Sequence, residues 1–412
     1  MPKVTPFRAI RPDVKVVDKV AALPYDVYNR KEACEVVKGN PLSFLNIDRA
    51  ETQFGADVDT YAPCVYEKAR ELLDARIADG TYVQEEAPVY YIYALTMDGR
   101  TQTGIVACSD VDDYQNDIIK KHENTREIKE QDRIRHVDAT DAHTGPIFLV
   151  YRQIDSIREV VARTKKNAPL YDYIAEDGVR HEAWIISDAA DIQTIQEGFA
   201  TIPATYIADG HHRCASAVKV GLKRRQENPN YTGEEGFNRF LSVLFPDDEM
   251  MIMDYNRVVK DLNGLTEAEF MAKVEELFEV KEASAQVHPE KKGTFGMYLG
   301  QKWYHLTAKA AICSDDAVEG LDVSVLQNSL LGPVLGIGDP RTDERIDFIG
   351  GIRGLGELER RCKEDMVVAF SMFPTSIEEL LDVADAHRLM PPKSTWFEPK
   401  LRSGLFIHRL TD

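Results

Sequence analysis

A short polar run follows an apolar strand pattern near the middle of the chain. We expect a strand over 204–208, a turn, and then a helix over about 211–226. The first turn of a helix has unpaired N–H groups and a partial positive charge, so it can bind an anion. Glycine lets the ligand approach the backbone, and arginine can bind a phosphate through two N–H groups, with the histidines as further donors. The run is Asp209-Gly210-His211-His212-Arg213.

Two other interpretations of this run are open. Asp209 can be the N-cap of the helix, with both histidines solvated in its first turn. Alternatively, Asp209, His211 and His212 can bind a metal ion together with Glu123 and support hydrolysis. Successive helix residues face different directions, which disfavours a zinc site built from adjacent histidines.

A second cluster lies at residues 120–136. Asn124 and Glu127 have capping-box spacing, so His122 and Glu123 are expected in the loop before a helix over about 125–141. There Glu123 is a candidate general base, with His122 as a catalytic candidate beside it. The spacing of 3, 4 and 3 residues places four basic side chains on one helix face, as a wall for an anion. They are Arg126, Lys129, Arg133 and His136.

The alternative for this helix is a solvated surface. Its charges can form the intrahelical pairs Arg126–Glu130, Lys129–Asp132 and Glu130–Arg133.

A third candidate is Lys393-Ser394-Thr395, which follows Pro391-Pro392. These side chains offer donors for a phosphate or a carboxylate, although the glycine framework of a P-loop is absent. The alternative is a surface connector before a last strand over 404–409.

Helix and strand patterns alternate around these clusters, which predicts the mixed α/β (α+β) class. Residues 1–246 are expected to form one domain, and residues 247–412 a second α/β domain of unknown role. Asn29 and Glu32 predict a helix start, and Met97-Asp98-Gly99-Arg100 predicts a hairpin turn. Further expected helices are 61–78, 191–199, 267–278, 357–363 and 377–388, and further expected strands are 146–151 and 239–245.

The net charge of the chain limits the kinds of molecule that it is expected to bind. The 412 residues include 50 Lys and Arg against 69 Asp and Glu, a net charge of −19, which disfavours broad binding to nucleic acid or to an anionic membrane. No apolar run approaches the roughly 20 residues of a spanning helix, and no secretory signal is visible. The six cysteines are far apart and form no C-x-x-C pair. We therefore expect a cytoplasmic protein without a disulfide framework.

Several segments together resemble a widespread prokaryotic family, catalogued as a domain of unknown function, number one thousand and fifteen. The resemblance covers nearly the whole chain, and Asp209–Arg213 is its most specific element. The other matching segments are Pro6–Pro12, Pro24–Val27, Asn40–Leu45, Lys121–Glu123 with Thr125, Lys129–Glu130 and Asp132–Arg133, Thr144–Pro146, and Pro391–Thr395.

The N-terminal part of that family is similar to the ParB/sulfiredoxin superfamily. There a Gly-x-x-Arg turn at a helix start holds nucleotide phosphates, and Gly210 to Arg213 match it. The reactive cysteine of sulfiredoxin is replaced by His211, so its chemistry is not expected. The net charge of −19 also disfavours DNA partition of the ParB kind.

Free-serine kinases form a further branch, and their resemblance covers about the first 245 residues. It implies a small-molecule phosphotransferase that uses ADP or ATP with Mg²⁺ and acts on L-serine or a similar hydroxylated acid. Asp26 and Glu123 are then the alternatives for the base, and Arg8, Arg126 and Lys129 hold a substrate carboxylate or a terminal phosphate. The alternative function is a nucleotide-sensing regulatory module without net catalysis. Oligomeric state is left open.

Overall fold

The computed structural model describes residues 1–125 and 127–411. The chain forms two compact units, residues 1–250 with 399–412 and residues 251–398. Both contain mixed helices and strands, so the predicted α/β class is confirmed. The expected boundary at residue 246 lies close to the observed one, but the last segment differs from the expectation, because 399–412 belongs to the first unit.

One large sheet organises the first unit. The hairpin turn between β4 (Tyr90–Met97) and β5 (Arg100–Asp110) is confirmed, with Asp98 and Gly99 both at positive φ. β8 (Ile147–Tyr151) is antiparallel to β11 (Thr205–Asp209) and parallel to β12 (Arg239–Pro246). The strands follow the order β6 (Ile119–Lys120), β11 (Thr205–Asp209), β8 (Ile147–Tyr151), β12 (Arg239–Pro246), β5 (Arg100–Asp110), β4 (Tyr90–Met97), β10 (Arg180–Ile186) and β9 (Tyr171–Ile174), and β1 (Val4–Thr5) pairs with β5.

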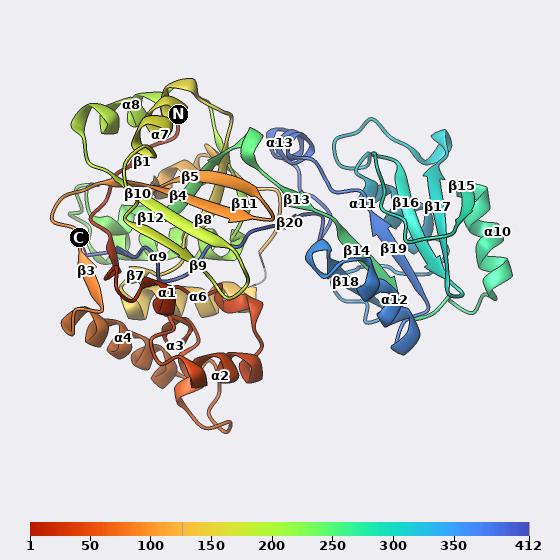
Figure 1. Ribbon diagram of the computed structural model, residues 1–412, viewed down its shortest axis with the longest axis horizontal. Helices are drawn as coiled ribbons and strands as arrows, with labels where there is room; N and C mark the ends of the chain where they lie inside the picture. Colours follow the sequence, from red (N-terminus) through yellow and green to blue (C-terminus); the bar gives the residue numbers. More distant parts are fainter. Residues whose placement is uncertain (126, 412) are drawn as a thin grey trace. The chain divides into compact units, whose positions relative to one another are not determined.

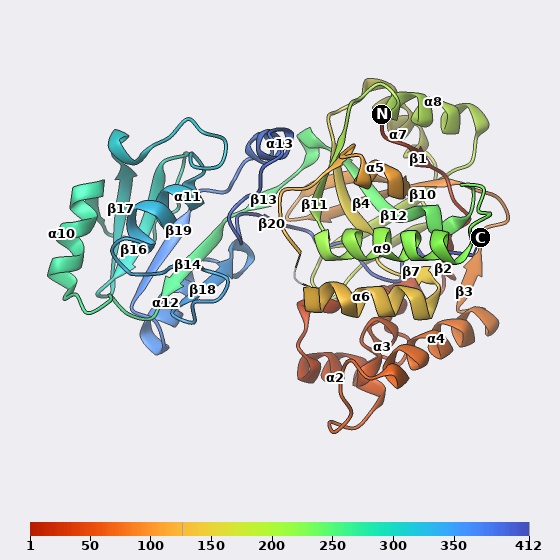
Figure 2. The same cartoon turned by 180° about the vertical axis from the view of Figure 1, so that it is seen from behind.

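Helices cover this sheet on two sides (Figures 1 and 2). α7 (Asp155–Thr164) and α8 (Ala189–Phe199) lie on one side, and α6 (Glu127–Thr140) and α4 (Pro63–Ala78) lie on the other. α9 (His211–Glu227) packs against α6 and follows β11 directly. α7, α8 and α9 bury apolar side chains together with the strands, which fixes the end of β11 and the start of α9 within one core.

A second core lies under the N-terminal helices. α2 (Arg30–Gly39) begins with the predicted capping box of Asn29 and Glu32. α3 (Leu45–Asp48) and α4 bury Leu45 and Leu73 in this core, together with Ile407 from the C-terminal segment. The shorter elements of the unit are β2 (Ile10–Pro12), α1 (Val17–Val20), β3 (Tyr82–Gln84), α5 (Val111–Gln115), β7 (Ala142–His143) and β21 (His408–Arg409).

The expected last strand over 404–409 is mostly irregular. Only β21 pairs, with β7, and Ile407 forms an isolated bridge with Ile10. The segment is held by contacts with distant parts of the unit rather than as an edge of the sheet.

The second unit has its own antiparallel sheet. α10 (Glu267–Leu277), α12 (Leu355–Glu364) and α13 (Ile377–Asp385) match predicted helices, and α11 (Asp322–Leu326) is a short further helix. β13 (Ile252–Met253) pairs with β20 (Trp396–Phe397). The strand order is β15 (Phe278–Ala283), β17 (Lys302–Ala308), β16 (Thr294–Leu299), β19 (Val368–Met372), β14 (Tyr255–Val259) and β18 (Ile346–Gly350).

In the part of the chain that the structure describes, no helix has both the length and the apolar character needed to cross a membrane.

Candidate functional site

The predicted strand–turn–helix arrangement is present at the end of β11. Gly210 is the N-cap of α9, with φ of 90°, so the interpretation of Asp209 as the N-cap is wrong. The positive φ explains the glycine, because side-chain-bearing residues rarely adopt it. Asp209 lies one residue earlier, where its Oδ1 accepts from the Gly210 N–H at 2.8 Å and its Oδ2 accepts from Lys400 Nζ at 3.1 Å.

The charge of Asp209 is stabilised by its neighbours. Burial alone would raise the pKa of this carboxyl, but the charges of Lys400 and Arg213 and the hydrogen bonds from Lys400 and Gly210 hold it below the usual range. Asp209 is therefore ionised at neutral pH and holds the C-terminal segment against the turn.

Arg213 points from the first turn of α9 toward the loop before β8. Its Nη1 donates to the Pro146 carbonyl at 2.6 Å. Its guanidinium lies over Gly210, where an added Cβ would stand 3.1 Å from Nε. At Gly145 an added Cβ would stand 3.6 Å from Arg213 Nη1 and 2.9 Å from Ser403 Oγ. Gly210 thus leaves space for Arg213, whereas Gly145 leaves space for the Ser403 hydroxyl.

His122 and His211 form a buried pair beside this turn, whereas the sequence predicted His122 in a loop and His211 as a donor to an anion. His122 and His211 are buried, with rings perpendicular at 4.5 Å and their Nε2 atoms 3.4 Å apart. Burial lowers the pKa of His122 to about 4 and that of His211 well below its usual value. Both rings are neutral at pH 7 and contact each other, while His212 stays half-buried.

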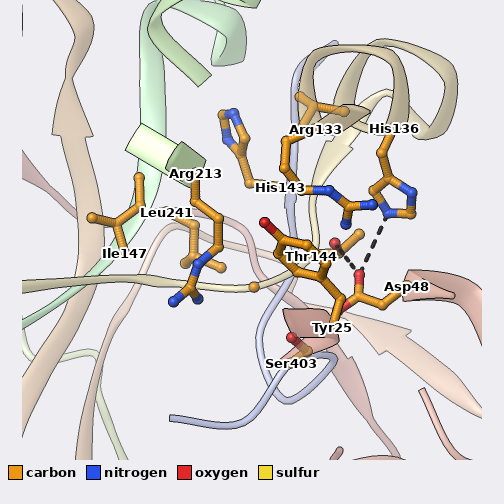
Figure 3. Close-up of a pocket in the computed structure, with 12 residues that line it drawn as sticks. Tyr25, Asp48, Arg133, His136, His143, Thr144, Ile147, Arg213, Leu241 and Ser403 are labelled. Carbon is orange, nitrogen blue, oxygen red and sulfur yellow. Dashed lines mark hydrogen bonds and ion pairs between the residues drawn. The ribbon is translucent and has the colours of Figure 1, made fainter. Parts of the chain in front are cut away.

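A cavity lies beside Arg213 (Figure 3). Its volume is about 30 Å³, and it brings together side chains from α3, α6, α9 and the C-terminal segment. Arg133 and Arg213 both line it, so two guanidinium groups face the same cavity. The lining residues are Tyr25, Asp48, Arg133, His136, Val137, His143, Thr144, Gly145, Ile147, Arg213, Leu241 and Ser403.

A buried carboxylate stands in the same wall. Asp48 Oδ1 accepts from Thr144 Oγ1 at 3.0 Å and lies 3.4 Å from His136 Nε2. Burial would raise the pKa of Asp48, but the hydrogen bonds from His136 and Ser403 and the charges of His136 and Arg133 lower it. The ionised Asp48 thereby holds His136 and Thr144 in place, as the dashed lines in Figure 3 show.

Arg133 separates this cavity from a second one. Its guanidinium lies 3.8 Å from the centre of the Tyr25 ring and 2.8 Å from Asp132 Oδ2. Burial alone would lower the pKa of Arg133, but the charge of Asp132 and the Tyr25 hydroxyl raise it, so Arg133 stays charged. The second cavity is also lined by Tyr25, Asp48 and His136, and it adds Asp26 and Lys129.

The basic helix face is therefore divided in the structure. Arg133 and His136 are buried, whereas Lys129 is exposed at the second cavity. The predicted partner Glu130 is buried and accepts from Lys219 of α9 and from Thr125, and Arg133 pairs with Asp132. Arg126 lies outside the described residues.

The other predicted residues lie apart from the two cavities. Glu123 is half-buried between β6 and α6 and lines neither of them. Arg8 is exposed, and its Nε donates to the Glu85 carbonyl at 3.3 Å. Lys393 belongs to the second unit. No group of three or more His, Cys, Asp or Glu among the described residues is placed to hold a metal ion, and Asp209, His211, His212 and Glu123 do not form one.

Sequence reasoning missed several residues of the cavity wall. Thr144 and Gly145 belong to a motif that was noted only for its resemblance, whereas Asp48, His143 and Ser403 gave no local signal. Asp48 and Thr144 are 96 positions apart, so only the folded chain brings them together.

The chain was compared with known proteins. No curated protein matches its sequence. A free serine kinase variant in complex with AMP is 16% identical over 71% of this chain and 87% of that chain, with a TM-score of 0.35. C-terminally truncated SbnI from Staphylococcus aureus is 12% identical over 71% of this chain and 82% of that chain, with a TM-score of 0.37. A conserved hypothetical protein from Pyrococcus furiosus is 16% identical over 73% and 93% of the two chains, with a TM-score of 0.33.

A family model described as "Protein of unknown function (DUF1015)" matches residues 4–324, which is most of the chain. The match includes the second cavity, the lining of the first cavity except Ser403, the turn at Gly210 and the start of the second unit. The chain therefore belongs to the DUF1015 family.

Proposed function

We propose that the first unit is a nucleotide-dependent phosphotransferase that acts on a small hydroxylated acid, such as free L-serine. The observation that carries this proposal is the pair of guanidinium groups, Arg133 and Arg213, on the wall of one cavity. Both are fixed, Arg213 by the Pro146 carbonyl and Arg133 by Asp132 and Tyr25. Guanidinium groups fixed before the ligand arrives suit a phosphate chain, because phosphoryl transfer depends mainly on positioning and charge stabilisation.

In the proposed reaction the acceptor hydroxyl oxygen attacks the terminal phosphorus of the nucleotide. The new P–O bond forms as the bond to the leaving phosphate oxygen breaks, and a carboxylate takes the hydroxyl proton. Asp26 and Glu123 are the two candidates. Asp26 is exposed and lines the second cavity, whereas Glu123 lies next to His122 near the start of α9.

ADP or ATP is the proposed donor, following the sequence resemblance to free-serine kinases. Mg²⁺ typically binds through substrate phosphates and one or two carboxylates, and the exposed Asp26 carboxylate suits that mode. When bound, the ion would neutralise charge on the phosphates.

The test is phosphorus NMR of the full chain with Mg²⁺, L-serine and either ADP or ATP. We expect a serine-dependent phosphomonoester resonance that falls at least 100-fold in rate in Arg213→Ala, because a guanidinium aimed at the transferring phosphate is lost. Arg163→Ala is the matched control, since Arg163 pairs with Asp191 between α7 and α8, on the other side of the sheet. Full activity in Arg213→Ala would contradict the proposal.

The variants Asp26→Asn and Glu123→Gln show which of the two carboxylates is the base. The base variant should lose turnover while AMP and ADP still bind, because each substitution removes a proton acceptor and keeps the side-chain volume. If both variants keep full activity, the assigned proton transfer is wrong. If the wild-type chain binds nucleotide and forms no product, phosphotransfer is refuted and a nucleotide-sensing module is supported.

A further inference from the structure

A buried cation in the second unit has no carboxylate partner among the residues that the structure describes. Arg257 lies on β14, and only 4% of it is exposed. Its Nη1 donates to the Tyr255 carbonyl, and its Nη2 donates to the Lys393 carbonyl at 2.9 Å. Within the described residues it forms no ion pair with Asp or Glu, and burial lowers the pKa of its guanidinium to about 10.

A second cation shares these surroundings. Lys393 is exposed, and its Nζ lies 5.5 Å from the centre of the Tyr255 ring. The Arg257 guanidinium lies 5.4 Å from the centre of the Phe348 ring, and Tyr255 and Phe348 contact each other edge to face. Aromatic faces stabilise a cation by about 0.5–2 kcal/mol and leave its charge in place.

The segment that carries Lys393 is held in one conformation. Lys393 has φ of 61°, which is uncommon for a residue other than glycine. Ser394 Oγ donates to the Pro391 carbonyl at 2.6 Å, and Thr375 Oγ1 donates to the Ser394 carbonyl at 2.9 Å. These bonds and the bond from Arg257 fix the backbone at Lys393 and Ser394.

Electrostatics favours an anion at this position. Burying a charge is costly unless an opposite charge or a set of hydrogen bonds compensates it, and buried arginines are ordinarily paired. Here two cations lie against one aromatic pair in a protein with a net charge of −19, and no carboxylate among the described residues pairs with either. A tetrahedral oxyanion would supply the missing charge and accept from guanidinium and ammonium N–H groups together.

We infer that Arg257 and Lys393 form a binding site for a phosphate-type oxyanion within the second unit. This inference does not depend on the proposed phosphotransfer. It gives the Lys393-Ser394-Thr395 motif a role in which Lys393 binds the ligand and Ser394 fixes the backbone.

Binding of inorganic phosphate to the full chain tests the inference. The Arg213→Ala chain is used as the background, because it removes one of the two guanidinium groups of the first-unit cavity and leaves the second unit unchanged. We expect saturable binding of one phosphate, measured by equilibrium dialysis with labelled phosphate. Lys393→Ala in this background should weaken binding at least tenfold, because it removes the exposed cation and leaves the buried one in place.

Lys302→Ala is the matched control, because Lys302 is an exposed lysine of the same unit, paired with Glu282 on the neighbouring strand. It should bind phosphate as the background does. Absence of binding in the Arg213→Ala chain, or equal affinity in the Lys393→Ala and Lys302→Ala chains, would overturn the inference. Neither result would bear on turnover in the wild-type chain, so failure here and failure of the proposed function are distinguishable.

Discussion

At the scale of single residues, some buried side chains of the site remain ionised and others are neutral. Asp48 and Arg133 stay ionised inside the first unit because each has an oppositely charged or hydrogen-bonding neighbour. His122 and His211 contact each other, and burial keeps both rings neutral although the Asp209 carboxylate is nearby. On an exposed helix turn, all of these side chains would be solvated. Burial therefore decides which of them can contact an anion.

The buried histidine pair leads to a prediction for the dependence of stability on pH. An unfolded histidine binds a proton below about pH 6.5, whereas folded His122 does so only below about 4. The unfolded state binds more protons in this window, so stability is lost as the pH falls from 6.5 toward 4. Because of His122, the free energy of unfolding should fall by about 2 kcal/mol between pH 7 and pH 5.

Urea unfolding of the wild type and His122→Gln at the two pH values measures this contribution. The buried histidines that do not contact His122 add to the loss in both proteins and cancel in the comparison. An identical pH dependence in the two proteins would show that His122 is not buried in its neutral form.

At the scale of elements, α9 connects the turn at Gly210 to the rest of the first unit. Lys219 of this helix pairs with Glu130 of α6, and Arg224 pairs with Asp138. Gly221 lets the middle of the helix approach a neighbouring segment, because an added Cβ would stand 2.5 Å from the Phe237 carbonyl oxygen. α9 is thus fixed on two sides, and the position of Arg213 at its start follows from these contacts.

Gly221→Ala should destabilise the protein although alanine is the better helix former. The clash with backbone requires a shift of α9, and we expect a loss of about 1–3 kcal/mol. The control is Gly356→Ala in α12, where no atom lies within 4 Å of an added Cβ. That change should be neutral or stabilising by up to about 1 kcal/mol. Thermal unfolding of both variants measures the difference, and equal melting temperatures would contradict the close packing of α9.

At the scale of the whole chain, residues 399–412 return to the first unit after the second unit is complete. Lys400 pairs with Asp209, and Tyr82 donates its hydroxyl proton to the Gly404 carbonyl at 3.0 Å. Ile407 bridges to Ile10, and its side chain is fully buried. The first unit therefore needs residues from both ends of the chain.

A chain that ends at residue 398 should consequently have a damaged first unit. It loses the buried residues Leu405, Phe406 and Ile407, and truncation of single large core residues alone costs about 2–5 kcal/mol. Limited proteolysis should degrade residues 1–250 and leave a fragment close to 251–398, which serves as the internal control. Survival of an intact 1–250 fragment would show that the C-terminal segment does not support this unit.

Much of the local structure could be predicted because its signals lie close together in the sequence. The capping box of Asn29 and Glu32 and the turn at Asp98 and Gly99 depend on neighbouring residues. The turn before α9 is local in the same way, since Gly210 must adopt positive φ between a strand and a helix. These elements match their expected positions closely, whereas the expected strand over 404–409 is reduced to His408–Arg409 because its partners are distant.

The sequence by itself determined the α/β class, the strand–turn–helix arrangement at Gly210 and the helix α6. Only the tertiary structure decided which residues meet, since Arg213 contacts Pro146 from 67 positions away and Lys400 contacts Asp209 from 191 positions away. In the tertiary structure Arg133 lines the first cavity, whereas Lys129 and Glu123 do not. The physical reason is that hydrogen bonds within a turn depend on adjacent residues, whereas burial and charge pairing depend on everything the fold packs against a side chain.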